Sequence, residues 1–137
     1  MEDVLNQKVE LLKQAYDKVD FVLRQLHKFE EEEGDEYTVF YYHGKVHKFT
    51  NDLVDLQMYL GQMIDNPHWS TTWACKEVHR LSKRVSKLAD WVKAAIGTSA
   101  IQELICLNFE MPKIQSLDLD YEAMKRETIK KNNEQNK

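Results

Sequence analysis

Residues that interrupt regular structure are scarce in this sequence. Its 137 residues include four glycines and two prolines. An all-β chain needs a turn about every ten residues, and turns depend on glycine and proline, so this scarcity favours long helices. Hydrophobic residues make up 42% and charged residues 31%. That balance argues against a disordered chain and suits one domain with a buried core.

Cysteine is also scarce, and neither sign of charge dominates. Cys75 and Cys106 do not form the CxxC spacing of metal and redox sites, so we expect two buried, reduced thiols. The formal net charge of −4 gives no overall attraction to nucleic acid or to an acidic membrane. No apolar run is long enough to span a bilayer, and no secretory signal is recognised. The expected location is therefore the cytoplasm, with no membrane partner.

Apolar side chains recur at alternating steps of three and four residues. In residues 2–33 they form one stripe: Leu5, Val9, Leu12, Tyr16, Val19, Leu23 and Leu26. This is the heptad rhythm of a helix packed along one seam. Gly34 suits the residue after a helix C-terminus, because glycine adopts the left-handed conformation at little cost, and Asp35 can cap the next helix.

The second segment admits two interpretations. Residues 37–50 are rich in β-branched and aromatic side chains, with a plausible turn at His43-Gly44, and could form a β-hairpin. A longer window favours one continuous helix over residues 35–65, because a single stripe keeps its phase through both halves. Its members are Val39, Tyr42, Val46, Phe49, Leu53, Leu56, Leu60 and Met63. We predict the helix and keep the hairpin as the alternative.

Asn66-Pro67 ends that helix, and further helices follow. A third stripe predicts a helix over residues 70–97, with these members: Ala74, Val78, Leu81, Val85, Leu88, Val92 and Ala95. A short fourth helix over residues 99–107 is predicted next. Pro112 then favours an extended, partly disordered tail, in which residues 121–131 could form a marginal amphipathic helix.

The predicted fold is therefore all-α, with three long antiparallel helices in a bundle plus the short fourth helix. Long helices of matched length with short connections are typical of antiparallel bundles. We expect residues 1–108 to form the helical bundle domain and residues 109–137 to form an extended C-terminal segment and flexible tail.

No recognisable arrangement of catalytic or metal-binding residues occurs in the sequence. His43 and His47 are four residues apart, which places both rings on one face of a helix, but no third or fourth ligand accompanies them. The Glu-x-x-His pairs of di-iron bundles are absent, as is a glycine-rich phosphate loop. We expect no metal, no cofactor and no enzymatic activity. A metal-dependent helical-bundle enzyme is the second alternative.

Basic residues lie off the apolar stripe of the third predicted helix, namely Lys76, Arg80, Lys83, Arg84 and Lys87. From Ser70 to Gly97 there are six basic and two acidic residues, so this stretch is positive in a chain that is negative elsewhere. One interpretation is a binding face for nucleic-acid phosphates or for an acidic protein patch. The other is a solvated face balanced by acids such as Asp52 and Asp55.

Aromatic residues exceed what one buried helix face can accommodate. Four lie within residues 37–42, including Phe40 and Tyr41, and Tyr59 follows on the same predicted helix. Trp69 and Trp73 flank the start of the next helix. Packing at the bundle end would account for the two tryptophans, whereas exposure would make them anchors for a partner.

These features predict a non-catalytic interaction protein. We expect an adaptor or inhibitor that binds a protein partner through Phe40, Tyr41, Tyr59, Trp69 and Trp73. Heptad stripes also favour a homo-oligomer. A nucleic-acid-associated factor that uses the basic face is the first alternative. Small size, uneven charge and an Asn/Lys-rich tail fit a viral or phage accessory protein.

Overall fold

The computed structural model describes residues 2–32 and 37–135, with the side chains of residues 3–29, 31 and 46–133. These residues contain no strand and five helices: α1 (Glu2–Glu32), α2 (Tyr37–Asp65), α3 (Thr72–Ser86), α4 (Asp90–Ile96) and α5 (Thr98–Gln135). The predicted all-α class is confirmed. Residues 37–50 belong to α2 throughout, which excludes the hairpin alternative.

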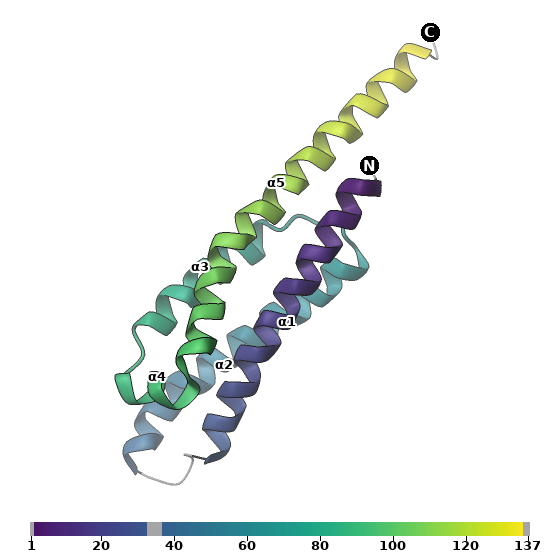
Figure 1. The fold of residues 1–137 in the computed structure, drawn as a ribbon. Coiled ribbons are helices and arrows are strands. Elements are labelled where there is room, and N and C mark those ends of the chain that lie inside the picture. The colour runs from purple at the N-terminus through teal and green to yellow at the C-terminus, as the bar shows by residue number, and fades with distance from the viewer. Residues whose placement is uncertain (1, 33–36, 136–137) are drawn as a thin grey trace.

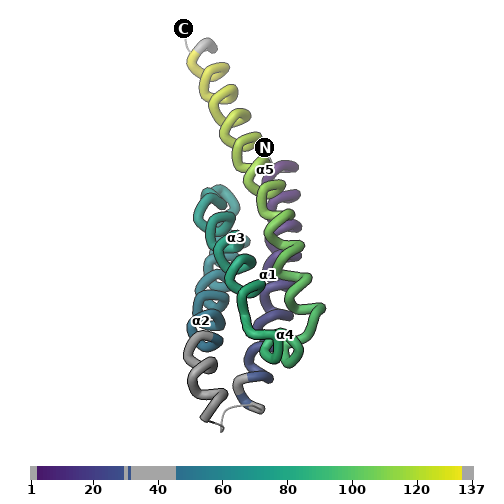
Figure 2. Tube along the Cα trace, turned by 90° about the vertical axis from the view of Figure 1, so that its left-hand side faces the viewer, coloured from purple at the N-terminus to yellow at the C-terminus, as the bar shows by residue number. Residues whose placement is uncertain are grey.

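Four helices form a closed ring of antiparallel neighbours. α1 packs against α2 and α5, and α3 packs against the same two helices. Successive long helices run in opposite directions, as Figure 1 and Figure 2 show. The short α4 lies at the end of the bundle where α1 finishes, and it contacts α1 and α5. At the opposite end, the last part of α5 projects past the N-terminus of α1 (Figure 1).

The core is built from the stripes that face the inside of this ring. The predicted positions of α2 from Val46 to Met63 and those of α3 from Ala74 to Val85 are buried. α5 contributes Ala100, Leu104, Leu107, Met111 and Ile114. The stripe of α1 differs from the prediction in its first turns. Leu5 and Val9 are half-buried, and Lys8 is almost completely buried instead.

The helix predicted over residues 70–97 is interrupted. α3 ends at Ser86 and α4 begins at Asp90, and Ala89 between them has extended backbone angles (φ −58°, ψ 146°). The change of direction buries Val92 and Ile96, whereas the predicted stripe residue Ala95 is exposed. Packing of α4 against α1 and α5 therefore overrides a stripe that no glycine or proline interrupts. The local signal is Asp90, because a carboxylate favours a helix N-terminus.

The predictions of a short fourth helix and of an extended segment after it are also wrong. α5 is one helix from Thr98 to Gln135 and passes through Pro112. Pro112 lies on the exposed side of α5, while Leu107, Met111 and Ile114 are buried on the other side. Burial of that side offsets the cost of proline in a helix interior, about 3 kcal/mol. The expected domain boundary at residue 108 falls inside this helix.

Both cysteines are free thiols, but only one is shielded. Cys75 is half-buried, and its Sγ donates to the carbonyl oxygen of Met111 at 3.5 Å. Burial raises the pKa of the Cys75 thiol, and the nearby charge of Asp118 adds to the rise, whereas the hydrogen bond with Thr71 opposes it. Cys106 is exposed, so the expectation of two buried thiols is wrong for this residue.

Candidate functional site

A buried lysine fixes the connection between α2 and α3. The Nζ of Lys8, on α1, donates to the carbonyl oxygens of Pro67 at 2.5 Å and Trp69 at 2.6 Å, and it pairs with the carboxylate of Asp118 on α5. These acceptors match its three donors. Asp118 also accepts from the backbone N–H of Thr71 at 2.8 Å and from its hydroxyl at 2.5 Å. We call Lys8, Thr71 and Asp118 the buried polar network.

This network determines where the connection between α2 and α3 lies. Lys8 is 1% exposed, and a buried ammonium group without partners costs several kcal/mol. Moving the connection away from Lys8 would remove two of its hydrogen-bond acceptors and would therefore be strongly unfavourable. Sequence reasoning missed the network, although a signal was present. Lys8 is in phase with Leu5, Leu12 and Ala15, and a charge in phase with an apolar stripe needs a buried partner.

An aromatic surface lies directly over the fixed connection. The Tyr59 ring packs edge-on against Trp73, with centroids 4.8 Å apart, and lies tilted relative to the Trp69 ring, with centroids 6.5 Å apart. The Tyr59 hydroxyl donates to the carbonyl oxygen of Ser70 at 3.0 Å, which ties the ring to the connection. Together with the neighbouring Met58, we call Tyr59, Trp69 and Trp73 the aromatic surface.

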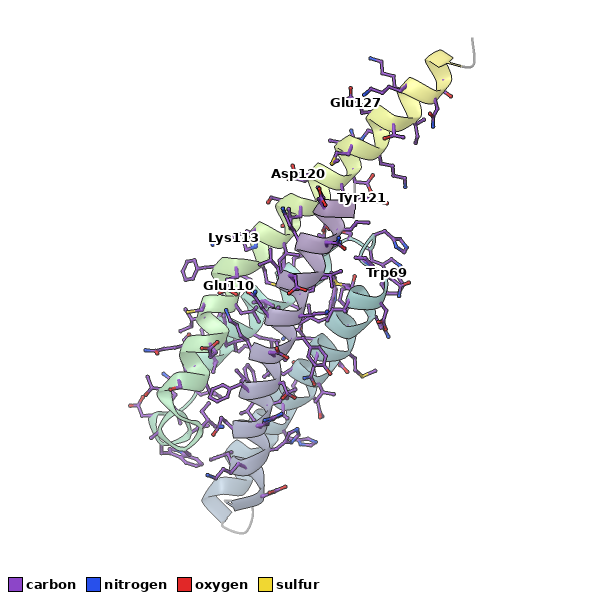
Figure 3. All side chains as sticks on the ribbon, turned by 45° about the vertical axis from the view of Figure 1, so that its right-hand side comes forward. Trp69, Glu110, Lys113, Asp120, Tyr121 and Glu127 are labelled. Atoms are coloured by element: carbon purple, nitrogen blue, oxygen red, sulfur yellow. The ribbon has the colours of Figure 1, made fainter. Side chains whose placement is uncertain are left out.

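The aromatic surface is open to solvent. Met58 is 60%, Trp69 38% and Trp73 44% exposed. Figure 3 shows Trp69 at the edge of the bundle, in the connection between α2 and α3. Met58, Tyr59 and Trp73 line a shallow groove, with Asp55 and Gln62 at its polar rim. Exposed apolar side chains held in one place around a groove are the usual form of a protein-binding hot spot.

Of the five predicted partner-binding residues, the structure brings together Tyr59, Trp69 and Trp73. Phe40 and Tyr41 belong to the helical backbone of α2, but their side chains lie outside the described set. Met58 was missed because it lies one position before Tyr59, off the apolar stripe of α2. An unbranched apolar residue off its stripe and beside aromatic residues is the signal that could have identified it.

The predicted basic face is partly neutralised. Arg80 binds Glu77 on α3, with Nε to Oε2 at 3.2 Å, and Asp52 on α2 at 3.1 Å. Arg84 binds the same Asp52 oxygen at 2.6 Å. Burial raises the pKa of Asp52, but the hydrogen bonds and charges of Arg84 and Arg80 outweigh it and leave the pKa below its ordinary value of 3.8. Asp52 therefore remains an anion at neutral pH.

The three lysines of the predicted basic face differ from its arginines. Lys76, Lys83 and Lys87 are exposed and form no ion pair with the described side chains. Lys87 lines a groove between α2 and α3 together with Arg80 and Arg84, whereas Lys76 and Lys83 do not. The groove also contains Lys48 of α2, which sequence reasoning missed because it considered one helix at a time.

The histidine pair gives no metal centre among the described residues. The side chain of His43 lies outside the described set, and His47 is exposed. The described part of the chain contains no group of three or more His, Cys, Asp or Glu residues that could bind a metal ion. It also contains no helix that is both long and apolar enough to cross a lipid bilayer.

No protein family, curated protein sequence or solved structure matches this chain.

Proposed function

We propose that this chain is a non-catalytic helical protein that acts in the cytoplasm by binding a protein partner through the aromatic surface. The observation that carries the proposal is the contact of Tyr59 with both Trp69 and Trp73 while the two tryptophans stay exposed. Tryptophan and tyrosine are among the residues most enriched in binding hot spots, because they bury large apolar areas and also form hydrogen bonds.

The buried polar network supports this proposal through preorganisation. A flexible loop loses conformational entropy when a partner orders it, and this loss lowers affinity. Here the carbonyl oxygens of Pro67 and Trp69 are already fixed by Lys8, and the Tyr59 hydroxyl is fixed by Ser70. The aromatic surface therefore binds with little ordering cost. The groove suits a partner segment that inserts one apolar side chain between Met58 and Trp73 and places polar groups beside Asp55 and Gln62.

A protein that binds a partner in this way fits the description of an adaptor or an inhibitor, as the sequence suggested. A viral or phage accessory protein fits the same description. Such proteins act by occupying a surface, for which a rigid helical scaffold with one exposed hot spot is sufficient. A homo-oligomer is compatible with the proposal provided that its contacts leave the aromatic surface free.

Site-specific photocrosslinking tests the proposal. A photoreactive amino acid replaces Met58 in one sample and Phe109 in another, because both side chains are exposed, the first on the aromatic surface and the second on α5. We expect a protein crosslinked in cells from position 58 but not from position 109. The same partner crosslinked from both positions would contradict the proposal, because the contact would then not be confined to this surface.

Binding of the identified partner is then measured with purified variants. We expect Trp73→Ala to weaken binding by at least about 30-fold, the effect of losing a hot-spot residue worth about 2 kcal/mol. Phe109→Ala is the control, because it removes an aromatic ring that is even more exposed (72% against 44%) and lies elsewhere, on α5, and we expect it to change affinity less than about twofold. Equal losses from both variants, or no loss from Trp73→Ala, would overturn the proposal.

A further inference from the structure

A second groove lies between α2 and α3, away from the aromatic surface. It is lined by Lys48, Phe49, Arg80, Arg84, Lys87 and Leu88. Four of these six residues are cations. Lys48 belongs to α2, Arg80 and Arg84 belong to α3, and Lys87 directly follows α3. We propose that this groove, which we call the basic groove, binds a phosphoryl group. The proposal concerns a different surface from the aromatic one and does not depend on it.

The basic groove differs from an ordinary solvated helix face because its cations come from both sides of the α2–α3 contact. Cations in the last turn of α3, such as Arg84, also complement the helix dipole, so positive charge there is not by itself evidence of a site. Lys48 has no such reason to be basic, because it lies in the interior of α2. The packing of α2 against α3 places it in the same groove as Arg84 and Lys87.

The arginines of the groove are held in position before any ligand binds. Asp52 accepts from Arg84 at 2.6 Å and from Arg80 at 3.1 Å. The Arg84 guanidinium lies over the buried Phe49 ring, with its carbon 5.7 Å from the ring centroid, a cation–π arrangement. Arg84 uses one terminal nitrogen for Asp52. A guanidinium has five donors in a planar fork, so its remaining N–H groups are available to oxygen atoms of a ligand.

The charge of the groove matches a phosphoryl dianion. Lys48, Arg80, Arg84 and Lys87 supply four positive charges, and the carboxylates of Asp52 and Glu77 balance two of them. Two positive charges therefore remain, and a phosphate monoester carries close to two negative charges at neutral pH. Lys48 and Lys87 are the groove's two exposed cations that form no ion pair with the described side chains, and they line it together with the two arginines.

A phosphate monoester fits the groove better than a nucleic-acid backbone does. Nucleic acid presents a row of single charges, and a protein that binds it usually offers a row of cations along the surface. Lys76 and Lys83, which would extend such a row along α3, lie outside the groove. The basic groove instead concentrates its charge at one place, which suits a single doubly charged group. That group is either free phosphate or a phosphorylated side chain of another protein.

Titrations at constant ionic strength test the proposal, with binding followed by amide and arginine Nε–H NMR signals near pH 8. The probes are inorganic phosphate, a phosphoserine peptide, its unphosphorylated form and a short single-stranded DNA. We expect saturable shifts around Lys48, Arg84 and Lys87 with phosphate and with the phosphopeptide. Tighter binding of the phosphopeptide would identify the protein-borne source. No saturable shift with either probe, or tighter binding of the DNA, would overturn the proposal.

Paired lysine variants distinguish a specific phosphate-binding site from general electrostatic attraction of phosphate to the protein. We expect Lys48→Ala/Lys87→Ala to weaken phosphate binding at least about tenfold, because it removes both unpaired cations of the groove. Lys76→Ala/Lys83→Ala is the matched control, since it removes the same charge from exposed positions outside the groove, and we expect less than a twofold change. All four lysines are exposed, so the variants should fold, and circular dichroism checks this. Equal effects of the two pairs would overturn the proposal.

Asp52→Asn tests whether the arginines are preorganised. This variant makes the protein more positive, so general attraction predicts tighter phosphate binding. If Asp52 positions Arg80 and Arg84, the variant instead weakens binding even though a negative charge has been removed. Weaker binding supports the proposed site, and tighter binding would overturn the claim that the groove is built for a phosphoryl group.

Discussion

The two ends of the bundle are closed by different kinds of interaction. At the end from which α5 projects, the buried Lys8 forms an ion pair with the half-buried Asp118, and this pair fixes the connection between α2 and α3. At the opposite end, α4 closes the bundle with apolar side chains. Phe29 packs against Trp91 with ring centroids 5.7 Å apart, and Val92 and Ile96 are buried.

This difference affects how each end should respond to mutation. Apolar packing weakens gradually, because each side chain contributes roughly in proportion to the area that it buries. A buried ion pair weakens abruptly, because removal of one partner leaves the other charged, buried and unpaired. The end that carries the aromatic surface is therefore the more sensitive one, and substitutions at both ends can test this.

The largest effect is expected from Lys8→Met, which leaves the half-buried carboxylate of Asp118 without its cation and the carbonyl oxygens of Pro67 and Trp69 without their donor. We expect the free energy of unfolding to fall by about 3–5 kcal/mol in urea denaturation. Lys18→Met is the matched control, because Lys18 also pairs α1 with α5 through Glu110, but at side-chain exposures of 24% and 36%. We expect the control to cost less than about 1 kcal/mol. Similar losses from both variants would remove the distinction between the buried and the surface pair.

A double variant sharpens this test. Lys8→Met combined with Asp118→Asn removes both charges, so it should lose at least about 1 kcal/mol less than the sum of the two single losses. Additive losses would mean that Lys8 and Asp118 do not depend on each other.

A medium effect, of opposite sign at two glycines, is expected from alanine substitutions. Gly97, between α4 and α5, has φ of +95°, a conformation that alanine adopts only under strain, although no atom lies within 4 Å of an added Cβ. Gly97→Ala should therefore destabilise the protein by about 1–2 kcal/mol. Gly61 is inside α2, and an added Cβ would lie 3.6 Å from Tyr16, an ordinary contact. Gly61→Ala should stabilise by about 0.5–1 kcal/mol. Thermal unfolding measures both, and a shift of the same sign would refute the pair.

A smaller effect is expected from Asp52→Asn, together with a defined pH dependence. The pKa of Asp52 is lower in the folded protein than its ordinary value of 3.8. Its contribution to stability is therefore complete above about pH 4 and disappears as the pH falls through the folded-state pKa. At pH 7 the variant should lose less than about 1 kcal/mol, because the pair is partly exposed. Below the folded-state pKa of Asp52 the two proteins should unfold alike, and a difference that persists there would contradict the assignment.

The smallest effect is expected from removal of residues 123–137. The described side chains of this stretch, residues 123–133, are all exposed, and the stretch follows Asp118, so the buried polar network remains intact. We expect the free energy of unfolding to change by less than about 0.5 kcal/mol, while the helical circular-dichroism signal falls. A large loss of stability would show that the projecting part of α5 contributes to closing this end.

The features that depend on the periodicity of apolar residues, such as the continuity of α2 and the positions it buries, could be predicted from the sequence. Val46, Leu53 and Leu60 keep one phase along α2, and their burial follows from it. Periodicity could not predict the turn at Ala89, because the apolar stripe continues through it. Asp90 is a local signal for a new helix, and the packing of α4 against α1 and α5 favours the turn. Periodicity also could not predict that α5 continues through Pro112, because that depends on burial of the opposite side.

The two candidate surfaces could likewise be predicted only in part from the sequence. Trp69 and Trp73 stand out in a sequence because tryptophan is large and rare, and their closeness in the chain predicts that they lie near each other. Their contact with Tyr59 depends on how α2 packs beside α3. The basic groove needed that packing too, because Lys48 and Lys87 are far apart in the chain and meet only in the folded protein.

Asp118 lies at the base of the projecting part of α5, on which Figure 3 marks Asp120, Tyr121 and Glu127. The same carboxylate binds Thr71 and Lys8, and Lys8 binds the backbone of Trp69. Two polar contacts therefore link the base of the projecting part of α5 to the backbone of Trp69. We therefore expect that a molecule which binds the free end of α5 and displaces Asp118 would also displace the backbone of Trp69, without contacting the aromatic surface itself.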